Sequence, residues 1–274
     1  MQPVTALTIA GSDSGGGAGI QADLRTFSAF QVHGTCAVTA LTAQNTLGVT
    51  RVCNTEPSMV VDQARAVLDD FEVVAVKTGM LAQPSTVEAV ADLARAGELL
   101  NLVVDPVLVS SSGHDLMAGG GALAYREALV PYALLVTPNL REAAILCDID
   151  VRDVKDIDDM VRLGQMLLAF GAQSVLVKGG HFIESGAMSH HAPDILLHAD
   201  DVEIFDAARV TTRNDHGTGC SLSAAIAAGL GLERSLHDAT RDAKAFVLSA
   251  LQGAASWNLG RGHGPIDHLG WQGE

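Results

Sequence analysis

Short apolar runs alternate with helical patterns along most of the chain. Residues 4–10 form an apolar run that predicts a strand, and the three-residue spacing of Leu24, Phe27 and Phe30 predicts a helix over residues 20–30. Repeated strand–helix units of this kind predict a parallel sheet covered by helices on both faces. The same alternation predicts strands at residues 36–43, 73–76, 102–104, 133–136 and 175–177, and helices at residues 57–71, 84–96, 119–129, 140–146 and 156–170.

The pattern changes after residue 178. A polar loop is expected at residues 184–193, followed by an antiparallel hairpin of strands 195–198 and 202–205 and a short strand at 208–211. Two helices close the chain, one running from about residue 220 to 230 and a long one at 236–255. Because we find no repeat, low-complexity tract or linker, we expect a single domain over residues 1–274.

Composition narrows the class of protein. Hydrophobic residues make up 48% of the chain and charged residues 18%, which is ample for a core. The net charge of −15 disfavours nucleic acids and anionic membranes as partners, because both require basic patches. No apolar run reaches the length of a membrane span, and no signal-peptide pattern is present. Four scattered cysteines without a C-x-x-C pair then predict reduced thiols and a cytoplasmic location.

Residues 215–225 combine a glycine loop with the start of an apolar helix. Gly217 and Gly219 allow the backbone to approach a ligand, and the first turn of a helix offers free N–H groups that bind an anion such as phosphate. Cys220 lies where the same field favours a thiolate. A buried helix entered through a glycine turn, with a structural cysteine, is the alternative interpretation.

A second glycine loop, residues 11–19, follows the first strand. It lacks the lysine of a P-loop and the glycine spacing of a Rossmann fingerprint, and the next strand ends in Gln44 and Asn45 rather than in an acid. The loop is therefore either a permissive turn or a place where backbone approaches a small ligand, with Asp23 one helical turn further on.

Polar residues follow several of the predicted strands: Asp105, Asn139 with Glu142, and Lys178. Ligands of parallel sheets bind beyond the carboxyl ends of the strands, so these side chains predict a site. A lysine, an anion-binding helix end and two carboxylates suited to hydrated Mg²⁺ favour phosphoryl transfer. Cys220 would then be the base; a covalent nucleophile is the alternative, although no Cys–His–Asn spacing supports it.

Six segments carry longer motifs, namely AGSDSGGGAGIQAD at residues 10–23, AQNT at 43–46, TGML at 78–81, TPNLREA at 137–143, VKGGH at 177–181 and HGTGC at 216–220. Together they closely resemble the bifunctional hydroxymethylpyrimidine kinase/phosphomethylpyrimidine kinase family of thiamine biosynthesis, over about residues 4–266. The resemblance implies a three-layer α/β/α ribokinase-like fold with a mostly parallel central sheet. It also implies two ATP-dependent phosphorylations, of 4-amino-5-hydroxymethyl-2-methylpyrimidine and then of its monophosphate. It leaves a homodimer open.

The resemblance also implies roles for individual residues. The substrate pocket is expected at Gly11, Asp23, Gln44, Met80 and Val107. Some relatives have Glu in place of Gln44, a change that should alter pairing strength more than substrate class.

A second group of residues is expected to bind Mg²⁺ and the phosphate groups. Asp105 and Glu142 match the Mg²⁺ region, acting through water, and Lys178 and Asn139 match the nucleotide phosphates. Gly217, Thr218 and Gly219 match the anion hole, with Thr218 also contacting the nucleotide, and Cys220 matches the base.

Cys220 leaves the substrate class open. Most of the wider superfamily has Asp at this position, and the thiol is shared by pyrimidine kinases and some pyridoxal kinases. Pyridoxine-type vitamers are therefore the second substrate class, and a non-catalytic vitamin- or nucleotide-binding protein is the alternative outside catalysis.

Overall fold

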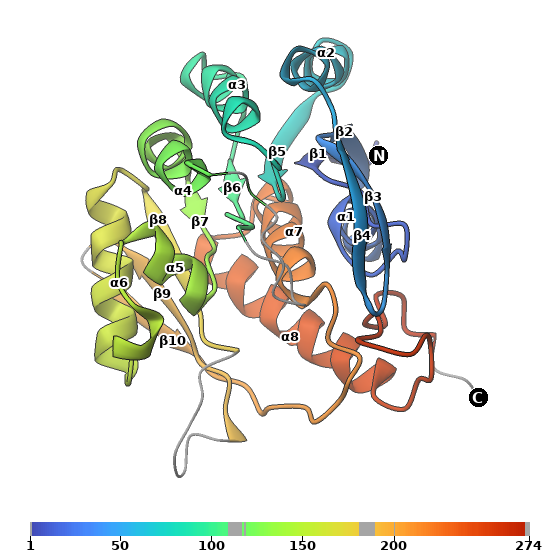
Figure 1. Cartoon of the computed structure of the whole chain (residues 1–274), viewed down its shortest axis with the longest axis vertical. Coiled ribbons are helices and arrows are strands. Elements are labelled where there is room, and N and C mark those ends of the chain that lie inside the picture. Colours follow the sequence, from blue (N-terminus) through green and yellow to red (C-terminus); the bar gives the residue numbers. More distant parts are fainter. Residues whose placement is uncertain (1, 109–116, 118, 181–189, 200, 272–274) are drawn as a thin grey trace.

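A twisted eight-stranded sheet forms the centre of the molecule (Figure 1). The computed structural model describes residues 2–108, 117, 119–180, 190–199 and 201–271. The strands lie in the order β10-β9-β8-β7-β6-β5-β1-β2, all parallel to one another except β9, which is antiparallel to both neighbours. Their bounds are β1 Thr5–Ala10, β2 His33–Val38, β5 Val73–Thr78, β6 Val103–Val104, β7 Leu135–Val136, β8 Ser174–Lys178, β9 Asp194–His198 and β10 Asp201–Phe205.

Helices cover both faces of this sheet. One face carries α1 (Gly19–Ala29), α7 (Thr218–Gly231) and α8 (Leu236–Ala254). The other carries α2 (Pro57–Leu68), α3 (Pro84–Arg95), α4 (Gly121–Ala124), α5 (Leu140–Leu146) and α6 (Ile157–Ala169). The expected three-layer α/β/α arrangement with a mostly parallel sheet is confirmed.

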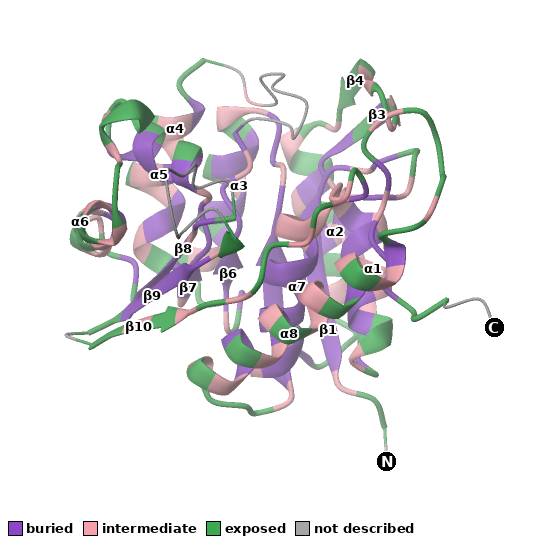
Figure 2. Cartoon of the chain, turned by 90° about the horizontal axis from the view of Figure 1, so that it is seen from below, coloured by how far each residue is buried: buried purple, intermediate pink, exposed green. Residues whose placement is uncertain are grey.

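The strands in the middle of the sheet contribute to both hydrophobic layers. In β1, Ala6 belongs to the cluster under α7 and α8, while Leu7 and Ile9 belong to the cluster under α2 to α6. Burial on both faces explains why the strands appear in the sequence as continuous apolar runs. Figure 2 shows the buried residues concentrated in the sheet and in α7.

Helix α7 is the most deeply buried helix of its face, with ten buried residues among its fourteen. A helix that is apolar on all sides must be enclosed, and its small side chains let neighbours come close. A Cβ atom built at Gly229 would lie only 2.9 Å from the Cβ of Ala239 in α8. The run of alanines in the sequence therefore produces a central helix rather than an amphipathic one.

A separate hairpin, β3 (Ala40–Asn45) with β4 (Gly48–Asn54), stands beside the sheet. The single strand predicted over residues 36–43 is wrong, because Thr39 divides it into β2 and β3. The Thr39 N–H donates to Ala10 O (3.0 Å) and its Oγ1 donates to Met80 O (2.6 Å), which ties the turn to the ends of β1 and β5.

Other expectations differ in detail. The helix predicted at 119–129 is α4 followed by a π-helical turn, Tyr125–Leu129. The strand predicted at 208–211 is wrong, since Ala208 forms only an isolated bridge with His191. The hairpin of β9 and β10 is confirmed. Most of the predicted loop at 184–193, and His181, lie outside the described residues. No helix in the described ranges is long and apolar enough to cross a membrane.

Candidate active site

Two glycine segments meet at the carboxyl edge of the parallel strands. Gly217 caps the start of α7 with a φ of +88°, a conformation that favours glycine. A Cβ atom at Gly217 would lie 1.8 Å from the carbonyl oxygen of Gly17 in the β1–α1 loop. Both segments are therefore in backbone contact, and the free N–H groups of the first turn of α7 lie at their junction.

Asp13 organises the β1–α1 loop, a role that the sequence did not reveal. Its Oδ1 accepts from Gly15 N (2.8 Å), and its Oδ2 accepts from Gly17 N (3.0 Å) and Ala18 N (2.9 Å). His216 Nε2 lies 2.9 Å from the same Oδ2. Burial opposes ionisation, but these hydrogen bonds and the His216 ring outweigh it and hold the pKa of Asp13 below its ordinary value.

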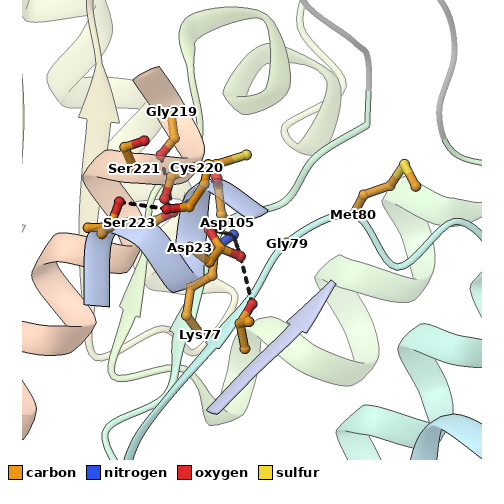
Figure 3. Close-up of polar contacts among 12 residues, drawn as sticks. Asp23, Lys77, Gly79, Met80, Asp105, Gly219, Cys220, Ser221 and Ser223 are labelled. Atoms are coloured by element: carbon orange, nitrogen blue, oxygen red, sulfur yellow. Dashed lines mark hydrogen bonds and ion pairs between the residues drawn. The ribbon is translucent and has the colours of Figure 1, made fainter. Parts of the chain in front are cut away.

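Cys220 lies in the first turn of α7 and is half-buried (Figure 3). Burial raises the pKa of the thiol to about 11, and the Lys77 ammonium opposes that rise. The expectation of a thiolate is therefore wrong for the free protein. The helix end favours ionisation, but removing the sulfur from water costs more.

Lys178 and Asp105 form an ion pair beside Cys220. The Lys178 Nζ donates to Asp105 Oδ1 at 2.8 Å, and Ser223 Oγ donates to Asp105 Oδ2 at 3.1 Å. A Cβ atom at Gly219 would lie 3.3 Å from the same Nζ, so the lysine reaches the first turn of α7. The strand ends of β6 and β8 thus bring a cation and a carboxylate to the first turn of α7, at the sheet edge where the sequence predicted a site.

Glu142 and Asn139 cap α5 reciprocally. Asn139 N donates to Glu142 Oε2 (2.8 Å), and Glu142 N donates to Asn139 Oδ1 (2.9 Å). Asn139 also forms a bridge with Lys178, which places the cap next to that lysine. Burial raises the pKa of Glu142 to about 8, with Lys178 lowering it and Asp105 raising it.

Most of the expected substrate residues lie around the β1–α1 loop. The Met80 methyl group packs against Gly11, where a Cβ atom would lie 2.3 Å from it, and Gly11 N donates to Met80 O (3.1 Å). Gln44 Nε2 lies 3.3 Å from His216 Nε2, at the end of β3. Val107, half-buried, lies two residues after Asp105.

Asp23 occupies a different environment from the one expected of a pocket residue. It is 0% exposed, both of its oxygens lie 2.9 Å from Lys77 Nζ, and Thr8 Oγ1 donates to Oδ2 at 2.6 Å. The sequence reasoning assigned no role to Lys77. A lysine in an otherwise apolar strand was the available signal, because a charge in a strand buried on both faces requires a partner.

This combination defines the class of protein. A helix N-terminus, a lysine at a strand end and an adjacent thiol on a mostly parallel α/β sheet are parts found in phosphoryl-transfer enzymes. The model of the phosphomethylpyrimidine kinase family matches residues 13–267, and the chain belongs to that family.

Relatives and solved structures agree with this assignment. The chain is 47% identical over 265 residues to a hydroxymethylpyrimidine/phosphomethylpyrimidine kinase of Rhizobium meliloti, covering 96% of each chain. It superposes on an ADP complex of Bacillus subtilis pyridoxal kinase with a TM-score of 0.86 and 35% identity, covering 97% and 98% of the two chains. A phosphomethylpyrimidine kinase of Clostridium difficile gives 0.78 and 36%, covering 90% and 99%. The protein is thus a kinase.

The contact between Gly217 and Gly17 predicts the effect of a methyl group there. We expect Gly217→Ala to lower the free energy of unfolding by about 3 kcal/mol or more and to abolish turnover. The φ angle of residue 217 is positive, and the added Cβ atom would clash with the carbonyl oxygen of Gly17. Gly219→Ala is the matched control, since its Cβ would meet only the far end of the Lys178 side chain, at 3.3 Å. Urea denaturation of both variants measures the difference, and equal stabilities would contradict the prediction.

The raised pKa of Glu142 predicts a pH-dependent stability. A carboxyl group that binds its proton more tightly in the folded state stabilises the fold at low pH, and this contribution is lost as pH rises from about 4.5 to about 8. Gln can still cap α5 but cannot ionise. As pH rises through that window, the free energy of unfolding of the unaltered protein should therefore fall relative to that of Glu142→Gln. The difference should change by up to about 1.4 kcal/mol per pH unit.

Urea denaturation at pH 5.5, 6.5 and 7.5 checks this expectation. Glu88→Gln, which removes an exposed carboxylate from α3, serves as the control. A difference between Glu142→Gln and the unaltered protein that stays constant, or shrinks as pH rises, would refute it.

Proposed function

We propose that this protein transfers the γ-phosphoryl group of ATP to 4-amino-5-hydroxymethyl-2-methylpyrimidine and then to the resulting monophosphate, giving the diphosphate for thiamine biosynthesis. The single observation that carries the proposal is the position of Cys220. It lies in the first turn of α7, where Lys178 Nζ approaches Gly219 and the Gly17 carbonyl group of the β1–α1 loop contacts Gly217.

Each side of Cys220 has its own task. Lys178 and the N–H groups of Gly219 and Cys220 neutralise charge on the transferred phosphoryl group, because such transfer depends mainly on positioning and electrostatics. Gly11, Gln44, Met80 and Val107 form the walls for the pyrimidine. The amide of Gln44 both donates and accepts, which suits the edge of an aminopyrimidine.

The first phosphorylation requires a proton to leave the substrate hydroxyl group. In the proposal, the Cys220 thiolate accepts that proton while the substrate oxygen forms its bond to phosphorus and ADP departs. Asp23 acts indirectly. Its side chain is 0% exposed and both of its oxygens are paired with Lys77, so it holds Lys77 in place rather than contacting the substrate.

The carboxylates fit a hydrated Mg²⁺ ion. Asp105 and Glu142 are 2% and 3% exposed, and both Asp105 oxygens already accept hydrogen bonds, from Lys178 and Ser223. Such groups suit an ion held through water and substrate phosphates rather than by a cage of protein ligands. When bound, the ion would supply positive charge to the phosphate oxygens.

A coupled ADP-release assay with ATP and Mg²⁺ tests the substrate class. Hydroxymethylpyrimidine and its monophosphate should both be turned over, with kcat/KM for pyridoxine at least about tenfold lower, because the donor and acceptor pattern at Gln44 matches the aminopyrimidine edge. Pyridoxine-type vitamers are the second candidate, favoured by the likeness to pyridoxal kinase structures. Turnover of pyridoxine alone would overturn the proposal.

Cys220→Ala separates the two steps. With the alcohol as acceptor, kcat should fall by about 10²–10⁴, the usual contribution of a positioned base. With the monophosphate as acceptor the fall should be much smaller, because a phosphate ester with a second pKa of about 6 has already lost its proton at pH 8. Near-normal turnover of the alcohol would remove Cys220 as the base, and equal losses would show that it serves both steps in another way.

A further inference from the structure

Lys77 and Asp23 form an ion pair that is completely buried. Both side chains are 0% exposed, and the ammonium nitrogen lies 2.9 Å from each carboxylate oxygen. Removing two charges from water costs several kcal/mol per ion, and well-packed apolar residues often stabilise a fold equally well. Stability alone therefore does not explain why this ion pair is present, and its position in the molecule indicates its role.

The pair lies in the protein interior next to the proposed substrate site. Alternation along β5 places Ala75 and Lys77 on the face covered by α1 and α7. A Cβ atom at Gly79 would lie 2.8 Å from Lys77 Nζ and 3.0 Å from the Cβ of Ala10. Gly11 and Met80, the next residues of these two strand ends, are expected to contact the pyrimidine.

Helix α1 connects this pair to Cys220. It packs against α7, the helix that carries Cys220, and its residue Asp23 holds Lys77. Figure 3 shows Asp23, Lys77 and Asp105 gathered beside the Cys220 side chain.

Four charged groups act on the sulfur from the surrounding elements. Lys77 on β5 favours the thiolate more than any other side chain does, while Asp23 on α1 and Asp105 after β6 oppose it. Lys178 on β8 lies on the phosphate side and interacts with the same sulfur.

The hydrogen bonding of Lys77 is also incomplete. An ammonium group has three N–H donors, and within the described part of the chain Asp23 is its one acceptor residue. At least one fully buried donor thus lacks a protein acceptor in those ranges, which is rare enough to need an explanation.

We propose that Lys77 is the counter-ion of the Cys220 thiolate and that Asp23 holds it in place for this purpose. Lys77 is then a positioning residue, which acts on the substrate hydroxyl group through the sulfur. Its catalytic consequence rests on the proposed function, but the coupling between ammonium and thiol is a property of the free protein.

Alkylation of Cys220 by iodoacetamide, followed by mass spectrometry of its peptide between pH 7 and 10, tests the coupling. The decisive variant is Lys77→Met combined with Asp23→Leu, which keeps the packing of α1 on β5 but removes both charges. We expect its alkylation at pH 8 to be at least about threefold slower. Raising the thiol pKa by one unit lowers the thiolate fraction about tenfold, and the higher nucleophilicity of the more basic thiolate offsets only part of that loss. Lys77→Arg should retain the rate within about twofold.

The buried Cys147 serves as an internal control for folding, because it must stay slow in every folded variant. If Lys77 only fastens α1 to the sheet, the double variant will react like the unaltered protein, and that result would overturn the proposal. If Lys77→Arg does not fold, the alkylation rate of the double variant still tests whether Lys77 affects the reactivity of Cys220.

Kinetics keep the two proposals apart. If Cys220 is the base, kcat for the alcohol in Lys77→Met should fall most at low pH, and its pH profile should shift upward relative to that of the unaltered protein. Full alcohol turnover by Cys220→Ala would remove the proposed base, yet a slowed alkylation in the double variant would still support the coupling.

Discussion

The backbone contact between Gly17 and Gly217 is the constraint on which the site depends. It brings the start of α1 and the start of α7 together, although the two glycines are far apart in sequence, and it can form only where residue 217 has no Cβ atom. Asp13 and His216 fasten the same junction from the side. These contacts hold the two glycine loops together as parts of one structure.

Electrostatics explains why the buried charges lie at this junction. The chain as a whole carries a net charge of −15, which repels a nucleotide and a phosphorylated substrate. Lys178 and Lys77 supply local positive charge on the two sides of Cys220, and Asp105 and Asp23 hold them in fixed positions. Each lysine is thus paired with a carboxylate that keeps it charged despite burial.

The sequence revealed the sheet and most of the site because both follow from local patterns. Strands buried on both faces leave apolar runs, and polar residues at their carboxyl ends must meet at one edge, which located Asp105, Asn139 and Lys178. Strand β4 was missed because none of its residues is buried, so it leaves no periodic signal. The partnership of Asp23 with Lys77 spans 54 residues of sequence, and neither residue indicates the other without the fold.

A thiol at position 220 has a consequence that a carboxylate would not have. The surrounding elements already supply Asp23, Asp105 and Glu142, and the site must also admit anionic phosphates. With a pKa of about 11, Cys220 adds no negative charge to the free protein. A carboxylate would be a fourth acid beside the nucleotide, and its charge would oppose binding of the monophosphate in particular. The thiol therefore suits an enzyme whose second acceptor is itself an anion, provided that a nearby cation such as Lys77 makes the proton transfer of the first step accessible.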